Sequence, residues 1–176
     1  RGFLQHSSER STIYAQVETA DHGAAFEELA AKYDRAEEVE TFTRSELYKA
    51  ESAGVVFYPG PGINKTAFDR SVFGDGSWAL CGITHTTSSA SAMDSVVDIL
   101  TAPVQPWDAL ICPSNAVKKN VETVLQAQAN YLKERLGITN LVLPLLPVIP
   151  LGIHTQDFRP SLDKRISARE QLDIKP

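Results

Sequence analysis

The feature that most constrains the fold of this chain is a series of short, continuous apolar runs separated by segments with helical spacing. Residues 55–58, 78–84 and 109–112 are such runs, and glycine, proline, serine or threonine residues follow each of them. Continuous apolar runs are typical of strands that are covered on both faces, as in parallel sheets built from βαβ units. The pattern therefore predicts an α/β fold, namely a Rossmann-like, three-layer domain with a mostly parallel sheet.

The rest of the chain fits the same alternation. In the amino-terminal third we expect strands and helices in turn, at residues 12–17, 24–33, 39–43 and 45–52. Farther along, the expected helices and the last strand fall at residues 91–100, 114–136 and 141–149. Asp21 and Ser114 precede helical patterns and are candidate N-caps, whereas Gly54 and Gly137 are placed to end helices.

The composition fits one globular domain and narrows the choice of partners. The chain has 176 residues, of which 43% are hydrophobic, enough to bury a core of its own. Its net charge of −5 lies in residues 1–54, which hold 11 acidic and 6 basic residues, whereas residues 55–176 hold 11 of each. An acidic region repels a polyanion, and no cluster of lysine and arginine offers phosphate contacts. We therefore expect no nucleic-acid partner.

Cysteine usage and hydropathy predict the compartment. Cys81 and Cys112 lie in apolar runs without CxxC or Cys/His ligand spacing, which favours buried thiols in a reducing cytoplasm. A run of about 18 apolar residues, which a membrane span requires, is absent from the sequence. The chain begins without methionine, so we expect it to be part of a longer protein.

The candidate site residues follow the predicted strands, because ligands of open parallel sheets bind at the carboxyl ends of strands. His85 follows one strand directly, where an imidazole would either hydrogen-bond a polar ligand or be held by neighbouring hydroxyls. The other candidates, proposed as substrate-binding residues, are Gly60, Gly62, Asn64, Thr86, Thr87 and Ser114. The hydroxyl residues among them would equally serve as helix caps, and the glycines as turn residues.

Several common catalytic patterns are missing from the sequence. It contains no GxSxG elbow, no HExxH pair and no GxxxxGK[ST] phosphate loop. The four histidines have no metal-ligand spacing. We therefore expect neither a metal nor a cofactor.

Four segments carry a resemblance to an enzyme family. Residues 78–86 end a strand in a histidine, and residues 108–117 run from a strand through a serine into a helix. Residues 148–160 are similar to "V-I-P-N-G-V-D-x-x-x-F-x-P", and residues 165–174 are similar to the short helix that follows that motif. In this order, the segments resemble the amino-terminal half of a retaining glycosyltransferase of family four, which has the GT-B fold. The resemblance covers about two-thirds of the chain.

The sequence also departs from the family pattern. Leu151 stands where asparagine is common, and His154 where aspartate is common. The family's first strand and its glycine-rich loop are not recognisable, and residues 1–4 look like the helix after that loop. A sheet that lacks this strand would expose an edge, so we also expect the fragment to associate with itself.

The resemblance implies a domain organisation and a function. Residues 1–160 would be the acceptor-side domain and residues 161–176 the start of the interdomain segment, with the carboxyl-terminal, donor-binding domain absent. The parent would be a hexosyltransferase that moves a sugar from a nucleotide sugar to a hydroxyl acceptor, a sugar or a glycolipid-like molecule, with retention. His85 would be catalytic, near the hydroxyls of the donor sugar. The parent would be cytoplasmic or peripheral to a membrane, and the fragment alone would be inactive.

Two alternatives stay open on the sequence. The first is a non-catalytic binding or interaction domain that kept the glycosyltransferase scaffold but lost the chemistry. The second is a small flavodoxin-like ligand binder, which the absence of a phosphate-binding loop disfavours.

Overall fold

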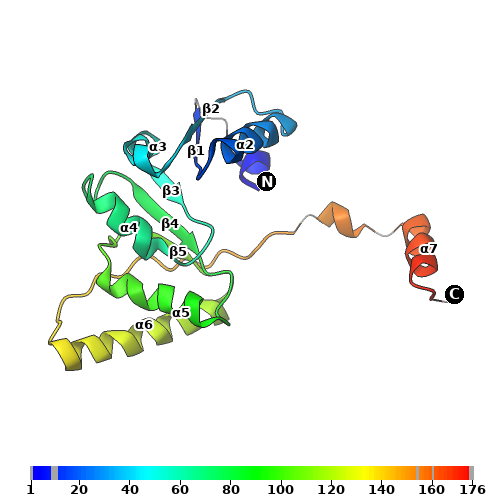
Figure 1. Ribbon diagram of the computed structural model, residues 1–176. Helices are drawn as coiled ribbons and strands as arrows, with labels where there is room; N and C mark the ends of the chain where they lie inside the picture. The colour runs from blue at the N-terminus through cyan, green and yellow to red at the C-terminus, as the bar shows by residue number, and fades with distance from the viewer. Residues whose placement is uncertain (1, 9–11, 154, 160, 175–176) are drawn as a thin grey trace.

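The computed structural model describes residues 2–8, 12–153, 155–159 and 161–174. It contains two parallel sheets (Figure 1). The smaller sheet pairs β1 (Thr12–Gln16) with β2 (Glu38–Phe42). The larger sheet has the order β3 (Val55–Phe57), β4 (Ala79–Ile83), β5 (Ala109–Ile111). The predicted α/β class with parallel strands in a Rossmann-like arrangement is confirmed.

Helices connect the strands and follow them. The α-helices are α1 (Gly2–His6), α2 (Ala20–Lys32), α3 (Ala50–Ala53), α4 (Ile63–Ser71), α5 (Ala90–Val97), α6 (Asn115–Leu136) and α7 (Leu162–Gln171). Three 3-10 helices, η1 (Arg44–Lys49), η2 (Asp98–Thr101) and η3 (Thr155–Phe158), occur among the described residues. Helix α4 was not expected from the sequence, since its N-cap, Gly62, forms no side-chain capping bond.

Local chemistry sets most of the helix ends. The Ser114 hydroxyl accepts a hydrogen bond from the Val117 N–H at 3.2 Å, which confirms it as the N-cap of α6. Gly54 and Gly137 end their helices with φ of 71° and 68°, in the left-handed region that favours glycine. The prediction that Asp21 is the N-cap of this helix is wrong. Helix α2 begins earlier, and Thr19 caps it because its hydroxyl accepts from the His22 N–H at 3.3 Å.

The main core lies on one face of the larger sheet. Leu80, Leu110 and Cys112 point from β4, β5 and the residue after β5 into this core, and each is at most 2% exposed. Helices α4, α5 and α6 supply the opposing side chains, which include Ile63, Ala67, Val96, Val121 and Leu125. A second, smaller cluster of Leu4, Ile13 and Ala30 lies under α2.

The other face of the larger sheet is covered less completely than the core face. Val55 and Phe57 of β3 are 45% and 56% exposed, whereas the residues of β4 and β5 that face the same way are half-buried. The expectation that the strands are covered on both faces is therefore wrong for β3. The strands follow one another across the sheet in the order β3, β4, β5, and β–α–β connections are right-handed. Connections of the same handedness that proceed in the same direction across a sheet place their helices on the same face. Here α4, α5 and α6 cover that face.

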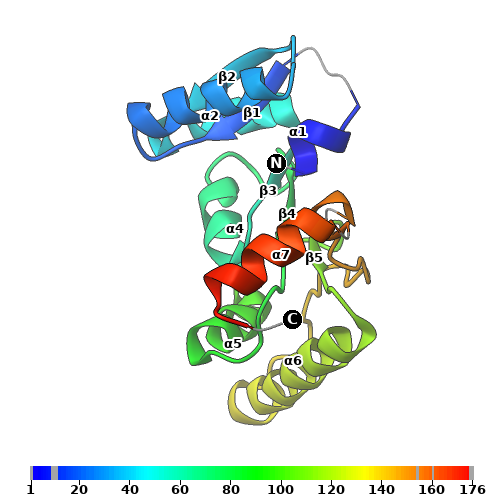
Figure 2. The same ribbon diagram turned by 90° about the vertical axis from the view of Figure 1, so that its right-hand side faces the viewer.

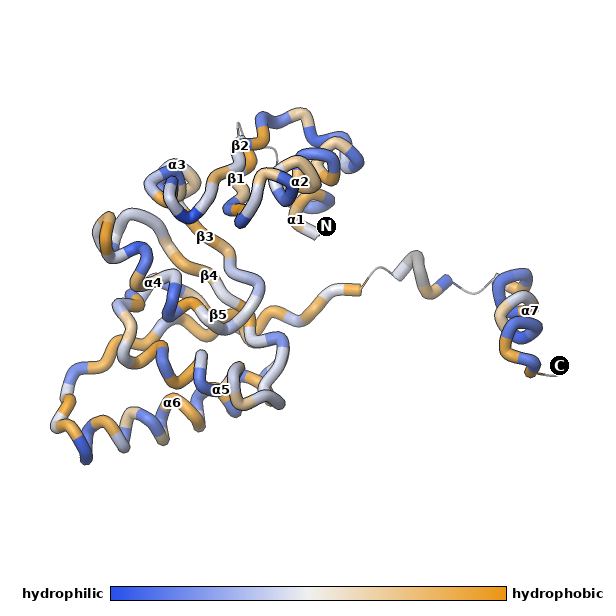
Figure 3. Tube along the Cα trace, viewed as in Figure 1, coloured by the Kyte–Doolittle hydropathy of each residue, from blue (hydrophilic) through white to orange (hydrophobic). Residues whose placement is uncertain are grey.

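The last predicted strand is reduced to two parallel bridges, Ala109 with Leu145 and Cys112 with Val148. The N–H groups of Leu145 and Ile149 donate to the Asp108 and Cys112 carbonyls, and Pro147 between them lacks the N–H group that a continuous ladder would need. Beyond these bridges the chain leads away from the sheet, and α7 lies apart from it in Figure 1. Figure 2 looks along this direction, so α7 is drawn in front of the strands. Apolar residues run along β3, β4, β5 and the segment after α6 (Figure 3).

Candidate functional site

The segments that carry the predicted site residues meet at one edge of the larger sheet. Strands β3, β4 and β5 are parallel neighbours, so their carboxyl ends lie side by side (Figure 1). Backbone hydrogen bonds continue the pairing past the strand ends. The Ile83 N–H donates to the Gly60 carbonyl at 3.0 Å, and the Thr84 N–H donates to the Ile111 carbonyl at 2.9 Å. We call these strand ends and the loops that follow them the carboxyl edge.

Gly82 determines how closely the first loop approaches the sheet. A Cβ atom at this position would lie 2.6 Å from Ile63 Cγ2 and 2.8 Å from the Gly60 carbonyl oxygen. Only glycine therefore allows the start of α4 to sit directly on β4. Sequence reasoning did not select Gly82, although a glycine inside an apolar strand is a signal of close backbone approach.

Gly60 and Gly62 are buried beside the ring of Tyr58. A Cβ atom at Gly60 would lie 3.0 Å from Tyr58 Cε1, so a larger residue there would displace the ring, whereas one at Gly62 would make an ordinary contact at 3.4 Å. The structure thus gives both glycines a packing role in the turn between β3 and α4. Their predicted contact with a substrate stays a prediction.

Two buried polar atoms at this edge have no hydrogen-bond partner among the described residues. Asn64 is 7% exposed, and its Nδ2 donates to Asp98 Oδ2 at 3.4 Å while its Oδ1 is unpaired. Thr84 is 1% exposed, and its Oγ1 is unpaired. An unpaired buried polar group costs about 1–3 kcal/mol, so such groups occur where water or a ligand completes the hydrogen bonding.

His85 is exposed at the end of β4, directly after the buried Thr84. The backbone bond from Thr84 to Ile111 fixes the chain immediately before it. The imidazole thus follows a hydrogen-bonded strand end and is exposed to solvent, where either ring nitrogen is able to hydrogen-bond a ligand hydroxyl. Its exposure is compatible with both interpretations, a ligand contact and a histidine held by the neighbouring hydroxyls, so this choice stays open.

The hydroxyl groups near His85 have local roles. Thr86 Oγ1 lies 2.9 Å from Ser88 Oγ and accepts from the Ser88 N–H at 3.3 Å. Ser89 caps α5 by accepting from the Ala92 N–H at 3.2 Å, as Ser114 caps α6. The capping interpretation is thus confirmed for two of these serines, whereas Thr87 is half-buried in the same loop. Substrate binding by Thr86, Thr87 and Ser114 stays a prediction.

The opposite edge of the sheet holds a buried ion pair. Arg70 and Asp108 are both 0% exposed, and the Arg70 guanidinium donates to Asp108 Oδ1 and Oδ2 at 2.7 and 2.8 Å. The same carboxylate accepts from the Leu80 and Gln105 N–H groups at 2.8 Å each. Arg70 also donates to the Trp78 carbonyl at 2.8 Å. This bidentate pair joins α4 to the amino ends of β4 and β5. Arg70 and Asp108 are 38 positions apart, and no local sequence pattern links them.

The two thiols are poor nucleophiles at neutral pH. Burial raises the pKa of both Cys81 and Cys112 above the ordinary thiol value. Cys112 is buried as predicted, whereas Cys81 is half-buried on the less covered face. Among the described residues, no group of three or more histidine, cysteine, aspartate or glutamate side chains is arranged to hold a metal ion.

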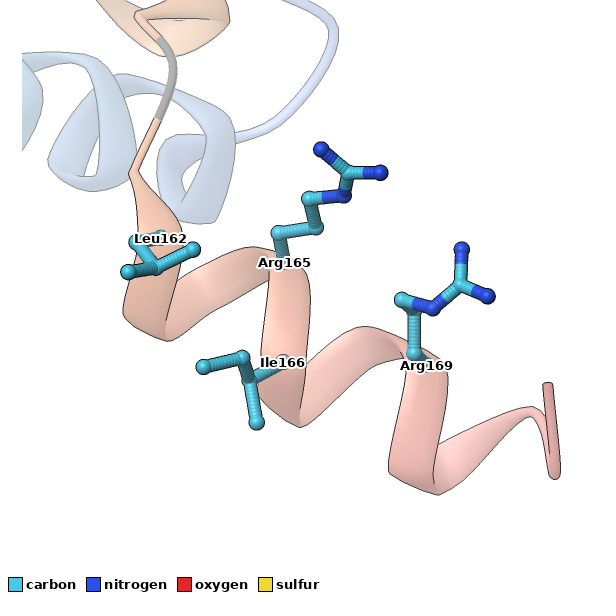
Figure 4. Close-up of a pocket in the computed structure, with 4 residues that line it drawn as sticks. All are labelled: Leu162, Arg165, Ile166 and Arg169. Carbon is cyan, nitrogen blue, oxygen red and sulfur yellow. The ribbon is translucent and has the colours of Figure 1, made fainter. Parts of the chain in front are cut away.

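A surface hollow lies elsewhere, on α7 (Figure 4). It has a volume of about 340 Å³ and is lined by Leu162, Arg165, Ile166 and Arg169. No predicted site residue lines it. Of the positions that depart from the family pattern, Leu151 is 61% exposed, and His154 lies outside the described residues.

Helices that combine the length and the apolar content of a membrane span do not occur in the described part of the chain. Comparison with known proteins adds no further assignment, since no protein-family profile, curated protein or solved structure matches this chain.

Proposed function

We propose that this chain is the acceptor-side, amino-terminal domain of a retaining glycosyltransferase of the GT-B type. The parent enzyme would transfer a hexosyl group from a nucleotide sugar to a hydroxyl of a sugar or glycolipid-like acceptor. The single observation that carries the proposal is the position of His85. It is the first exposed side chain after β4 at the carboxyl edge of a parallel sheet, and it belongs to the segment that resembles this family.

The chemistry of the carboxyl edge suits a polyhydroxylated ligand. His85 and the nearby threonines offer neutral donors and acceptors, which match hydroxyl groups. Asn64 Oδ1 and Thr84 Oγ1 are further acceptors without a hydrogen-bond partner among the described residues. In the proposed reaction His85 hydrogen-bonds a hydroxyl of the donor sugar and thereby orients the anomeric carbon toward the acceptor. Orientation of this kind lowers the barrier by making the reacting groups neighbours.

The same residues supply little of the remaining catalysis. Departure of a nucleoside diphosphate requires positive charge near the leaving group. The predicted site consists of one imidazole, one amide, three hydroxyl residues and two glycines, and none carries a fixed positive charge. The chain alone is therefore expected to show no transfer and only weak affinity for nucleotide sugars. The charge would come from the second domain of the parent.

The proposal is tested in the natural protein that contains these residues, with a panel of nucleotide sugars and hydroxyl acceptors. His85→Ala should lower kcat/KM about 10- to 100-fold, the loss expected for one strong hydrogen bond. His22→Ala is the matched control, because His22 is also an exposed histidine but lies on α2. Transfer unaffected by His85→Ala, or robust transfer by residues 1–176 alone, would contradict the proposal.

A second candidate is a binding domain that has the scaffold but no chemistry. It is favoured by the local hydrogen bonds of Thr86 and Ser114, which already occupy hydroxyls assigned to the substrate. The two functions differ in one outcome. A binding domain would bind a sugar acceptor at the carboxyl edge, but the natural protein would transfer no sugar with any nucleotide sugar in the panel.

A further inference from the structure

Four residues meet at the start of α4, beside the carboxyl edge. A Cβ atom at Gly62, the N-cap of α4, would lie 3.4 Å from Tyr58 Cε1 and 3.7 Å from Asn64 Oδ1. The same atom would lie 3.9 Å from the hydroxyl oxygen of Ser95, which belongs to α5. We call these residues, Tyr58, Gly62, Asn64 and Ser95, the Gly62 cluster. It gathers an aromatic ring, an amide oxygen and a hydroxyl group around a residue that has no side chain.

Asn64 turns an unpaired oxygen toward this cluster. The residue is 7% exposed, and its Nδ2 donates to Asp98 Oδ2 at 3.4 Å. This bond fixes the orientation of the amide, because the reverse orientation would set two oxygen acceptors against each other. Oδ1 is therefore the atom without a partner among the described residues, and it lies beside Gly62. A buried acceptor of this kind requires a hydrogen-bond donor that the described residues do not supply.

Helix α4 offers donors at the same helix end. Its N-cap forms no side-chain capping bond, and its first turn contains no acidic residue. The first N–H groups of a helix have no intrahelical acceptor. That of Ile63 donates to the Pro61 carbonyl at 2.9 Å, which leaves the following amides of the turn for another acceptor. A hydroxyl group fits this combination because it both donates and accepts, whereas a sulfate ion cannot donate and an ammonium group cannot accept.

The Tyr58 ring supplies an apolar surface beside this polar group. The Tyr58 N–H donates to the Cys81 carbonyl at 2.8 Å, so the backbone is held against β4. The side chain is 42% exposed, and its ring lies against Gly60 and Gly62. The negatively polarised face of an aromatic ring attracts C–H groups, such as those of a sugar. Because Asn64 Oδ1 is shielded from solvent, we expect the Tyr58 ring to shift when a ligand hydroxyl reaches that atom.

We propose that the Gly62 cluster is a subsite for a sugar, in which one hydroxyl donates to Asn64 Oδ1 and the neighbouring C–H groups pack on the Tyr58 ring. The Ser95 hydroxyl donates to the Ser91 carbonyl at 2.9 Å, so its lone pairs accept from a second hydroxyl of the sugar. Tyr58 and Ser95 are thus positioning residues for the ligand. The choice of a sugar rests on the proposed function, whereas the need for a donor at Asn64 rests on the geometry alone.

The side-chain amide signals of Asn64 in the ¹⁵N-labelled chain test this subsite, because a hydrogen bond to Oδ1 changes the chemical shifts of the attached amide. Glucose, galactose and mannose are the probes. We expect at least one of them to shift the Asn64 signals and none to shift those of Asn130, whose Oδ1 accepts from Gln126 at 3.0 Å on α6. Sulfate, which cannot donate, should leave both sets of signals unchanged.

Gly62→Ala is the most direct variant. The new methyl group would make ordinary contacts at a φ of −78°, so the fold should persist, but it would occupy the space beside Asn64 Oδ1. We expect the affinity for the sugar to fall about tenfold, the loss expected for one hydrogen bond. Gly76→Ala is the matched control and should leave the affinity unchanged, since a Cβ atom there would meet nothing within 4 Å. Circular dichroism should show that both variants are folded.

Tyr58→Leu tests the aromatic surface separately. It should weaken sugar binding about three- to tenfold, because it removes the ring face but leaves Asn64 Oδ1 in place. Tyr48→Leu is the matched control, because Tyr48 is 56% exposed but lies on η1. Equal affinities of Tyr58→Leu and Tyr48→Leu would contradict the positioning role of the ring.

The outcomes separate the subsite from the proposed function. Unchanged Asn64 signals with all three sugars, or equal sugar affinities of Gly62→Ala and Gly76→Ala, would overturn the subsite. Transfer by the natural protein that Gly62→Ala leaves unchanged would also overturn it, while the glycosyltransferase proposal would stand. Sugar-induced shifts at Asn64 in a protein that transfers no sugar would support the subsite and contradict the glycosyltransferase proposal.

Discussion

The two edges of the β3–β4–β5 sheet differ in how their polar groups are paired. We call the edge that holds the Arg70–Asp108 pair, at the amino ends of β4 and β5, the amino edge. At the amino edge, the Asp108 carboxylate accepts four hydrogen bonds and is 0% exposed, as is Arg70. At the carboxyl edge, His85 is exposed, and buried atoms of Asn64 and Thr84 have no partner among the described residues. We infer that the first edge serves stability, and we propose that the second contacts a ligand.

This difference explains why the most conspicuous buried charges are not the candidate site. The Asp108 carboxylate uses both oxygens on Arg70 and on backbone N–H groups, whereas Arg70 Nε has no hydrogen-bond partner among the described residues. The loss of either partner would leave a buried charge uncompensated. The carboxyl edge has the opposite properties, namely exposed donors and acceptors on rigid strand ends. The following predictions test this division, from the largest expected effect to the smallest.

Asp108→Asn should give the largest effect. It removes the charge that compensates Arg70, and breaking a buried pair in this way costs about 3–5 kcal/mol in the free energy of unfolding. Urea denaturation measures the change. Asp69→Asn is the control, because Asp69 pairs with Arg44, whose side chain is 76% exposed, and exposed pairs contribute about 0–1 kcal/mol. Equal losses in both variants would refute the structural role of the Arg70–Asp108 pair.

Gly82→Ala should destabilise the chain by about 1–3 kcal/mol, because the new methyl group would overlap Ile63 and the Gly60 carbonyl. The first loop of the carboxyl edge would have to move away from β4. Urea denaturation again gives the change, with Gly76→Ala as the control, since a Cβ atom there would meet nothing within 4 Å. A Gly82→Ala variant as stable as the control would mean that the loop does not rest on β4.

Ser114→Ala should lower the free energy of unfolding by about 1 kcal/mol through loss of the N-cap of α6. Ser114→Asp retains a side-chain oxygen that accepts from the Val117 N–H and should therefore restore most of the stability. If both variants lose the same stability, the Ser114 hydroxyl has a role other than capping.

His85→Ala should have the smallest effect on folding, within about 0.5 kcal/mol, as expected for an exposed residue outside the core. Thermal or urea unfolding of the variant checks this. A loss comparable to that of Asp108→Asn would show that His85 supports the fold, and the two edges of the sheet would then not differ in kind.

Local signals account for what could be predicted from the sequence. Ser114, Gly54 and Gly137 each act within one turn of a helix, so their roles follow from nearby residues. The Arg70–Asp108 pair joins residues 38 positions apart, which no local pattern encodes. Helix α4 contains Arg70 and also buries Ile63 and Ala67 in the core, so tertiary contacts stabilise it. The side of the sheet that the helices cover depends on the direction in which the crossovers advance, and strand composition alone does not contain that information.

The candidate site was predictable in position but not in detail. The rule that ligands bind at carboxyl strand ends placed His85, Asn64 and Ser114 on one edge before the sheet order was known. Two properties of the site follow only from the structure and not from the sequence. One is the unpaired, buried state of Asn64 Oδ1 and Thr84 Oγ1, and the other is the packing of Gly60 against Tyr58. Both arise from contacts between loop and strand.

The most direct test of the account is a titration of the ¹⁵N-labelled chain with sugar acceptors, followed by two-dimensional NMR. We expect shifts of the amide signals at the carboxyl edge, around Gly60, Thr84–His85 and Ser114, and none around Leu80 and Gln105 at the amino edge. His22→Ala should leave these shifts unchanged, because His22 lies on α2. Shifts centred on the amino edge, or none at the carboxyl edge with any sugar acceptor, would contradict the assignment of the carboxyl edge as the ligand-binding surface.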